Sequence, residues 1–476
     1  SSSSSADATK RITSGVGNLN FFGDSDSNDD DDNGFRIDYG GGGSNAAAGS
    51  SSSSSSSSYS SASLGHARDS GKGALPRDTT VVDVAARNAR SEPITIKDAR
   101  QIRKLLFGDR RADYFNGAWK EQGFFFDQSP GLGFGLVQKE GGPCGVLGAV
   151  QAFILKHLLF ASRSSSPSGS WRNPSRKDQE AALISALAEI LWCAASSGGK
   201  SDGSGNGPRE VVVALQSRRG GSVAGRVPNY KPDGLTEELL LYRPGGASRD
   251  APSLAATRDF VDAHLASFMD PSGCGVVLFT YSLLLTRGLA GVADDMDTMV
   301  EPPSLIGRHN YAAQELVNLL LCGRAHSNVF DGEQDMGGGM VLRGVPHRGP
   351  IGMLTLFEHY DHVRVGDRFK NPELPVWVLC SESHYSVLFS EDTSCAHSSD
   401  AIVELFYYDE LGKQDELYRL TVTPNKEAGA RASSEEADSR GAKEQKEGDL
   451  TPPIEHVIRT RWKGASVDWN GSEALL

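Results

Sequence analysis

The feature that most constrains this chain is an apolar stretch that begins at Cys144 and runs to Leu158. Its large apolar residues recur three and four positions apart, which is the spacing of an α-helix. They are Val146, Leu147, Val150, Phe153, Ile154 and Leu158. A helix this apolar buries most of its surface, so we expect it to run through the core of a folded domain.

The residues around the start of this helix favour a reactive thiol. Cys144 is flanked by Gly141, Gly142, Pro143 and Gly145. A cysteine at a helix N-terminus faces the positive end of the helix dipole and the unpaired N–H groups of the first turn, and both favour the thiolate. A buried structural cysteine is the alternative, but such a position needs no open backbone. The sequence therefore predicts that Cys144 is a nucleophile.

Composition excludes several other classes of protein. The chain has 476 residues, a formal net charge of −13 and six cysteines. The acidic balance argues against non-specific binding to nucleic acid or anionic membranes. The cysteines form no Cys-x-x-Cys pair, which favours free thiols in a reducing compartment, the cytoplasm or the nucleus. No secretory signal is visible, and Lys156, His157 or Gly288 breaks the longest apolar runs, so no membrane span is expected.

Low-complexity segments divide the chain. Residues 1–90 are dominated by Ser, Gly, Ala and Asp. They cannot bury enough apolar area to offset chain entropy, so they are predicted to be disordered. Residues 91–476 are predicted to form one catalytic domain, with mobile insertions near 161–178, 196–209 and 423–449.

Helical patterns dominate the first half of this domain and strand patterns the second half, which predicts an α+β fold with a helical half packed against a sheet. The expected helices cover 98–107, 180–194 and 312–321, and the expected strands cover 210–215, 375–380, 385–389, 401–408 and 417–422. The apolar run 275–285 fits either a buried strand or a helix, because its residues show no distinguishing period.

A thiolate nucleophile needs a base and donors for the oxyanion. His384 lies between two strand-like apolar runs, so a sheet edge would hold its ring rigidly. His384 is therefore a candidate for the base, although a core histidine or a surface turn residue also fits this position. Gln138 precedes Cys144 by six residues, and its amide N–H₂ can point at the oxygen that the Cys144 backbone N–H reaches.

The base in turn needs a group that orients it. Asp409 ends the strand run that follows His384, and its carboxylate could accept the imidazole N–H. A turn residue at a strand end is an equally good explanation of Asp409. Glu382 and Asn310 are weaker competitors for the same role.

The order Gln-x5-Cys at a helix start, followed by a strand histidine, resembles the papain-like cysteine proteases. Longer blocks resemble the MINDY family of deubiquitinases, in particular its FAM-type branch. The resemblance runs with gaps from about residue 93 to the C-terminus, and its blocks are Gln128–Leu147, Gly352–Tyr360, Trp377–Ser390 and Ile458–Asn470.

This resemblance implies a papain-like fold, with a helical half packed against a mainly antiparallel sheet, and the activity of a cysteine-type ubiquitinyl hydrolase. The enzyme would cut the isopeptide bond after the C-terminal glycine of ubiquitin, with a preference for the chain linkage that directs substrates to the proteasome. Position by position, Cys144 matches the nucleophile, His384 the base and acid, and Gln138 the oxyanion donor. The resemblance assigns no third residue.

Ubiquitin ends in Gly-Gly, which only a narrow channel would select. Gly141, Gly142 and Gly145 would offer the close approach that such a channel needs. The expected partners are ubiquitin and polyubiquitin chains, bound by a monomer without a cofactor, nucleic acid or membrane. No separate ubiquitin-interaction motif is found.

Metal and phosphate sites are disfavoured. Zinc usually needs three or four ligands at recognisable spacing. The segment Glu358–His362 offers two histidines three apart, while Cys380-x3-His384 and Cys322-x3-His326 are each half of a zinc pattern. The run Gly337–Gly339 lacks the form of a phosphate-binding loop and is predicted to be a flexible loop.

Two other functions remain as alternatives. The first is a pseudoenzyme that holds ubiquitin chains without cutting them, which the presence of Cys144, His384 and Gln138 disfavours. The second is an acyl transferase that uses the same thiol and passes the acyl group to an amine.

Overall fold

The computed structural model describes residues 90–108, 114–161, 170–197, 210–216, 230–245, 253–297, 303–397, 401–412, 414–425 and 450–474. The predicted disordered tail, apart from Arg90, lies outside the described residues, as does most of the three predicted insertions. Within the first insertion, the 3-10 helix η2 (Ser170–Arg172) and the start of α6 are described.

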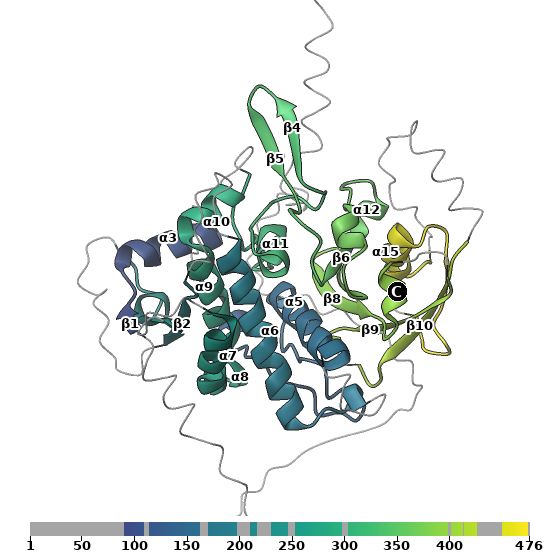
Figure 1. Cartoon of the computed structure of the whole chain (residues 1–476), viewed down its shortest axis with the longest axis horizontal. Coiled ribbons are helices and arrows are strands. Elements are labelled where there is room, and N and C mark those ends of the chain that lie inside the picture. Colours follow the sequence, from purple (N-terminus) through teal and green to yellow (C-terminus); the bar gives the residue numbers. More distant parts are fainter. Residues whose placement is uncertain are drawn as a thin grey trace, which may run out of the picture. The chain divides into compact units, whose positions relative to one another are not determined.

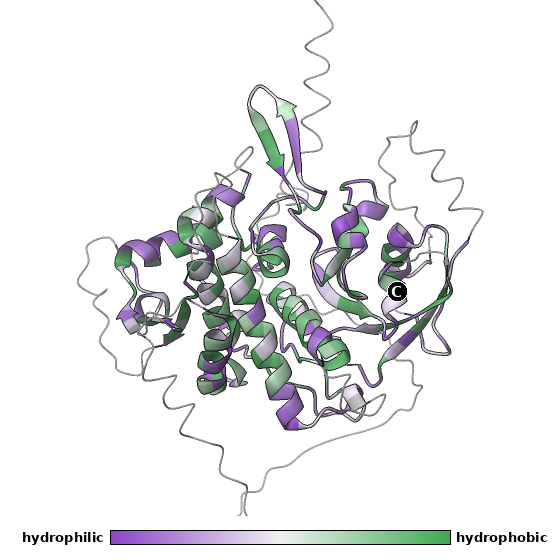
Figure 2. Ribbon diagram, viewed as in Figure 1, coloured by the Kyte–Doolittle hydropathy of each residue, from purple (hydrophilic) through white to green (hydrophobic). Residues whose placement is uncertain are grey.

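The predicted core helix is present as α5 (Cys144–Lys156), followed by the π-helical turn η1 (His157–Ala161). Every residue of α5 from Cys144 to Leu155 is buried. Helix α6 (Arg176–Ser196) and α11 (Gln314–Cys322) pack on one side of α5, and the main sheet packs on the other (Figure 1). Hydrophobic residues follow α5 along its length (Figure 2), as expected for a helix enclosed by protein.

The sequence predicted no apolar run long enough to span a membrane. Judged by length and composition alone, this prediction is wrong. The stretch Cys144–Ala161 is long and apolar enough, as is the pair 275–287 and 289–295 if its 84° bend is counted within one span. The helical run continues past Lys156 as the π-helical turn η1, and both Lys156 and His157 pair with Glu189 of α6. Most of Cys144–Ala161 is buried inside the molecule, which is typical of the core helix of a folded domain.

The remaining helices surround α5 or lie at the edges of the helical half. They are α3 (Ile96–Phe107), α4 (Gly117–Lys120), α7 (Leu254–Ala263), α8 (Leu265–Met269), α9 (Gly275–Arg287) and α10 (Leu289–Asp295). The predicted helices at 98–107, 180–194 and 312–321 are confirmed within a few residues. Helix α3 begins before Asp98 because the Thr95 hydroxyl caps it by accepting the Asp98 N–H at 3.1 Å.

The second half of the domain is built on a six-stranded sheet of order β11-β10-β9-β8-β7-β6. Only β6 and β7 are parallel, and the other neighbours are antiparallel. The strands are β6 (Gly352–Thr355), β7 (Val376–Ser381), β8 (His384–Phe389), β9 (Val403–Tyr408), β10 (Tyr418–Thr423) and β11 (Ser466–Asp468). The prediction of an α+β fold with a mainly antiparallel sheet is confirmed.

The central strands β7 and β8 are buried on both faces of this sheet. Alternate residues of β7, such as Val378 and Cys380, join the core around α5, while Trp377 and Leu379 join a second core on the opposite face. Helices α12 (Leu356–His359), α13 (Asp367–Lys370) and α15 (Pro453–Arg461) contact the sheet, and η5 (Thr393–Ala396) follows β8. Burial on both sides fixes the register of the strands that carry His384 and Asp409.

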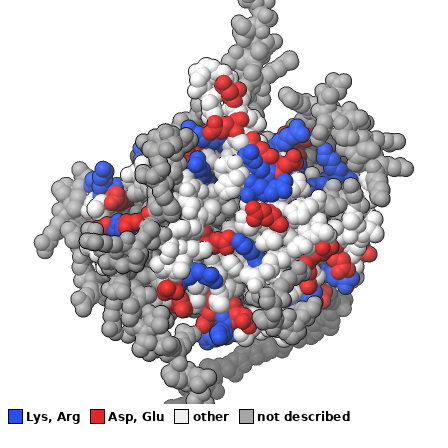
Figure 3. Space-filling model, in the orientation of Figure 1, with Lys and Arg blue, Asp and Glu red and all other residues white. Residues whose placement is uncertain are grey.

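Two smaller sheets complete the described fold. One has the order β1-β3-β2 (Arg90–Pro93, Leu239–Arg243 and Val213–Gln216), with the 3-10 helix η4 (Thr236–Glu238) before β3. The other is the hairpin β4–β5 (Glu333–Gly337 and Met340–Arg343), which extends away from its neighbours in Figure 1. Its tip is the predicted glycine loop. Acidic and basic side chains are interspersed on the face that Figure 3 shows.

Candidate active site

Cys144 is the first residue of α5, where the sequence placed it. Pro143 precedes the helix with φ −80° and ψ 8° and gives it no side-chain cap. Gly142 has φ +133°, a conformation that L side chains rarely adopt. The chain therefore enters α5 through a turn that only glycine makes easily, and the thiol stands at the N-terminus of the helix.

The Cys144 thiol is enclosed at rest. The residue is 1% exposed, and its Sγ lies 3.8 Å from the Ser383 carbonyl oxygen and 4.0 Å from the Gly142 carbonyl oxygen. Ser383 precedes His384 in the turn between β7 and β8. The backbone of the base-bearing turn thus reaches the nucleophile directly.

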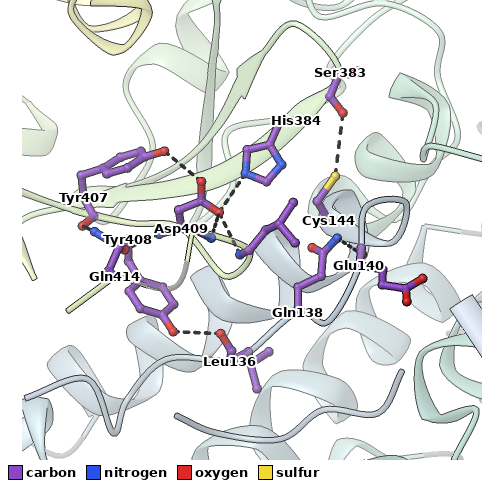
Figure 4. Close-up of polar contacts among 12 residues, drawn as sticks. Leu136, Gln138, Glu140, Cys144, Ser383, His384, Tyr407, Tyr408, Asp409 and Gln414 are labelled. Carbon is purple, nitrogen blue, oxygen red and sulfur yellow. Dashed lines mark hydrogen bonds and ion pairs between the residues drawn. The ribbon is translucent and has the colours of Figure 1, made fainter. Parts of the chain in front are cut away.

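His384 starts β8 and pairs with Ser381 across the turn. Its Nε2 lies 2.8 Å from Oδ1 of Asp409. Figure 4 shows the imidazole ring between Asp409 and Cys144. Because Nε2 is engaged by the carboxylate, the ring presents Nδ1 to the thiol. The structure thus brings together three residues that lie far apart in the sequence.

The environment of His384 favours its charged form. Burial acts to lower the pKa of the imidazole, but the hydrogen bond and negative charge of Asp409, together with the Cys144 thiol, outweigh it and raise the pKa well above its usual value. An imidazole held in this way can take a proton from the thiol and keep it beside the carboxylate.

Asp409 is itself held in place. Its Oδ1 accepts N–H groups of Leu411 at 2.9 Å and Gly412 at 3.1 Å, and its own N–H donates to Oε1 of Gln414 at 2.7 Å. The carboxylate therefore approaches His384 from a rigid turn, and it is 8% exposed.

The two competitors for the orienting role lie elsewhere. Glu382 forms the tip of the β7–β8 turn with φ 55°, and its carbonyl oxygen is 3.5 Å from Sγ of Cys380. Asn310 accepts the indole N–H of Trp119 at 2.7 Å through its backbone carbonyl. Of the three candidates, Asp409 is the one whose carboxylate contacts the imidazole.

Gln138 lies beside the nucleophile and is fully buried. One Nε2–H donates to the Glu140 carbonyl oxygen at 2.6 Å, as Figure 4 shows, and its backbone N–H donates to the Glu410 carbonyl oxygen at 2.8 Å. A primary amide carries two N–H donors, so a second one remains for an oxyanion. Its Oε1 accepts no hydrogen bond from the described residues.

Glu410 is a residue of this site that the sequence analysis missed. It is 2% exposed, and no other described residue hydrogen-bonds its carboxyl oxygens. Burial first, and then the charge of Asp409, raise the pKa of the Glu410 carboxyl well above its ordinary value. A glutamate in an Asp-Glu-Leu-Gly turn has the sequence signature of an exposed residue, so no signal in the sequence pointed to it.

The three glycines predicted to line a substrate channel differ in position. Gly141 is exposed, whereas Gly142 and Gly145 are buried. A Cβ at Gly142 would lie 3.0 Å from the Trp119 indole nitrogen, and one at Gly145 would lie 2.8 Å from Cβ of Ala312. Gly142 and Gly145 therefore have close neighbours inside the protein, and the channel that these glycines are predicted to line stays a prediction.

The residues considered for zinc have other contacts. Glu358 forms an ion pair with Lys370 at 2.7 Å, and the His359 ring stacks on His456 with 4.0 Å between centroids. Across the described ranges no group of three or more His, Cys, Asp or Glu side chains lies together as a metal site would require.

Comparisons with known proteins identify the family of this chain. The family model described as "Deubiquitinating enzyme MINDY-3/4, conserved domain" matches residues 103–471. The chain is 42% identical over 394 residues to the probable ubiquitin carboxyl-terminal hydrolase MINDY-4 of Xenopus tropicalis, covering 81% of this chain and 47% of that protein.

Two human proteins show similar relationships. The probable ubiquitin carboxyl-terminal hydrolase MINDY-4 of Homo sapiens is 40% identical over 397 residues, which is 81% of this chain and 47% of that protein. The human ubiquitin carboxyl-terminal hydrolase MINDY-3 is 35% identical over 300 residues, which is 62% of this chain and 65% of that protein.

The chain thus spans about half the length of the MINDY-4 relatives that it matches. No solved structure matches it. The family model covers Cys144, Gln138, His384 and Asp409 within one continuous match. The chain belongs to the MINDY-3/4 family of deubiquitinating enzymes.

Proposed function

We propose that this protein is a thiol protease that hydrolyses the isopeptide bond after the C-terminal glycine of ubiquitin. The observation that carries the proposal is the His384 ring, which lies between Asp409 and the Cys144 thiol at the start of α5. Family membership and the names of the relatives support the choice of ubiquitin as substrate.

In the first step, Nδ1 of His384 takes the proton of the Cys144 thiol, and Asp409 stabilises the imidazolium through Nε2. The thiolate attacks the carbonyl carbon of the ubiquitin C-terminal glycine. The oxyanion then receives the free Nε2–H of Gln138 and the Cys144 backbone N–H.

In the second step, the imidazolium gives its proton to the lysine amine, which leaves as the carbon–nitrogen bond breaks. A thioester between Cys144 and ubiquitin remains. His384 then removes a proton from water, which attacks the thioester, and it returns that proton to the departing sulfur.

The burial of the thiol supports a glycine-terminated substrate. Cys144 is 1% exposed, so we propose that the substrate segment that reaches its sulfur is thin. Two consecutive glycines provide such a chain, because their backbone carries no Cβ to clash with the walls. Gly141 is exposed on the loop next to Cys144 and is our proposed contact for this tail.

The test uses ubiquitin carrying a C-terminal electrophile. We expect it to label the wild-type protein and not Cys144→Ala. Chain binding without labelling would favour the pseudoenzyme, and transfer of ubiquitin to an added amine in place of water would favour the acyl transferase.

We also propose a preference for the polyubiquitin linkage that directs substrates to the proteasome. Cleavage of a panel of linkage-defined ubiquitin oligomers tests it, and equal rates on all linkages would refute it. The described cysteines are all free thiols, which supports residence in the cytoplasm or nucleus. Fractionation of cells that express the protein would test this location.

A further inference from the structure

Gln138 and Glu410 are joined through their backbones, and both carry buried side-chain oxygens without a hydrogen-bond partner among the described residues. The Gln138 N–H donates to the Glu410 carbonyl oxygen at 2.8 Å, so the two residues are direct neighbours. Three of their side-chain oxygens are buried and accept no hydrogen bond from another described residue. These are Oε1 of Gln138 and both carboxyl oxygens of Glu410. Buried polar atoms of this kind rarely remain without partners in folded proteins.

If Glu410 were ionised, it could not supply a hydrogen-bond donor to Oε1 of Gln138. A carboxylate and an amide oxygen both only accept hydrogen bonds, so neither could satisfy the other. The carboxylate would also place a second negative charge beside Asp409, in a position that is 2% exposed. Burying an unpaired charge is costly, and a carboxyl in such a place binds a proton instead.

A protonated Glu410 has an O–H group, which can donate a hydrogen bond to Oε1 of Gln138. The carboxyl also lies close to α5: a Cβ at Gly148 would be 3.8 Å from Oε1 of Glu410. Gly148 follows Cys144 by four residues and so lies on the same face of the helix. The Glu410 carboxyl therefore lies against α5 about one turn after Cys144.

We propose that Glu410 is a positioning residue that remains a neutral carboxylic acid and donates its proton to Oε1 of Gln138. The bond fixes which way the amide faces. With Oε1 held by Glu410 and one Nε2–H held by the Glu140 carbonyl oxygen, the second Nε2–H points to the oxyanion. Burial and the charge of Asp409 support the neutral form, because both raise the pKa of Glu410.

The inference rests on the proposed hydrolase function, so its test has one arm that needs activity and one that does not. The activity arm measures kcat and KM of the full chain on a ubiquitin substrate. We expect Glu410→Leu to lower kcat about 10- to 100-fold with little change in KM, since the loss of one oxyanion donor has an effect of about that size or larger.

Two further comparisons separate positioning from general damage. Glu410→Gln keeps a donor for Oε1, so its kcat should exceed that of Glu410→Leu by at least about ten-fold. In a Gln138→Ala background, Glu410→Leu should change kcat little, because the group that it positions is gone. A kcat for Glu410→Gln as low as that of Glu410→Leu, or full additivity of the two mutations, would overturn the proposal.

The second arm measures urea unfolding of the same four proteins: wild type, both single variants and the double variant. We expect the effects of Gln138→Ala and Glu410→Leu on the free energy of unfolding to be non-additive. Glu315→Leu is the matched control, since Glu315 is another buried carboxyl, on α11, with a pKa raised by burial to about 7. Its effect should add to that of Gln138→Ala.

The activity measurement and the unfolding measurement can contradict the two proposals independently of each other. If the wild type does not cleave ubiquitin, the proposed function is wrong, and the unfolding cycle still decides whether Glu410 and Gln138 are coupled. If the wild type is active and Glu410 and Gln138 act additively in both arms, only the positioning role is wrong.

Discussion

Asp409→Asn is the substitution that tests the catalytic geometry most directly. Oδ1 of Asp409 accepts from His384, Leu411 and Gly412, while Oδ2 has a 3.5 Å contact with the Tyr407 hydroxyl. An asparagine oxygen can keep all three bonds of Oδ1, with the new N–H₂ in the place of Oδ2. The substitution thus removes the charge and keeps the shape of the site.

The expected loss follows from the distance between the two groups. Two unit charges 2.8 Å apart attract each other by about 1.5 kcal/mol in bulk water and about 6 kcal/mol at an effective dielectric constant of 20. The side chain of His384 is 28% exposed and that of Asp409 is 8% exposed. We therefore take about 2–3 kcal/mol, which predicts a fall in kcat/KM of about 30- to 150-fold.

The same substitution should change the pH dependence. Asp409 helps to raise the pKa of His384 above its ordinary value, so removing the charge lowers that pKa. The imidazolium of the thiolate–imidazolium pair is then lost at lower pH. We expect the alkaline limb of the kcat/KM profile to move to lower pH in Asp409→Asn.

Hydrolysis of a ubiquitin C-terminal amide, followed from pH 5 to 10 as the assay range, measures both effects. Asp409→Ala is the comparison: it also strips the Leu411 and Gly412 N–H groups of their acceptor and should lose more activity and some stability. If Asp409→Asn has the kcat/KM of the wild type and the alkaline limb of its pH profile does not move, the negative charge of Asp409 has no role in catalysis.

The other predictions concern single elements of the site and the fold. Cys144→Ala and His384→Ala should each abolish cleavage while circular dichroism and ubiquitin binding stay unchanged; appreciable turnover by either variant removes that residue from its role. Gln138→Ala should lower kcat by about 10²–10³, and an unchanged kcat would exclude it as the oxyanion donor. Gly145→Ala should destabilise the fold by about 1–3 kcal/mol in urea unfolding, because its Cβ would lie within 3.1 Å of two side chains. Deletion of 1–90 should leave turnover on short ubiquitin chains nearly unchanged, and a large loss would show that the tail contributes to catalysis.

Local sequence patterns predicted most of the elements that position the site. The 3.6-residue period of α5 and the apolar runs of β7, β8 and β9 were sufficient, because each element has a strong pattern and turn residues at its ends. Helix α9 was not distinguished from a strand. Its residues from Gly275 to Leu284 are all buried, so no polar face marks the helical period.

The choice of Asp409 over Glu382 and Asn310 needed the register of the sheet. Strand β8 pairs with β9 so that Val387 lies opposite Tyr408. Asp409 directly follows this pair, and its Oδ1 lies 2.8 Å from Nε2 of His384 at the start of β8. No spacing within the sequence contains this relation, since it arises when two strands pair.

Packing supplies what the sequence pattern does not contain. At Gly142 and Gly145 the entry to α5 lies close to Trp119 and Ala312. Glu410 was overlooked because a charged residue in a turn is normally solvated. Only the assembled fold shows that the turn after β9 lies against the helix that carries the thiol.

The wide separation of the reacting residues along the chain has a consequence for biosynthesis. Cys144 and the neighbour of its base, Ser383, are 239 positions apart, and the carboxylate follows later still. A nascent polypeptide still on the ribosome exposes its sulfur long before the imidazole has been translated. The thiol, the imidazole and the carboxylate therefore come together only once nearly the whole domain has been synthesised and folded, so an unfinished chain carries the sulfur without its base.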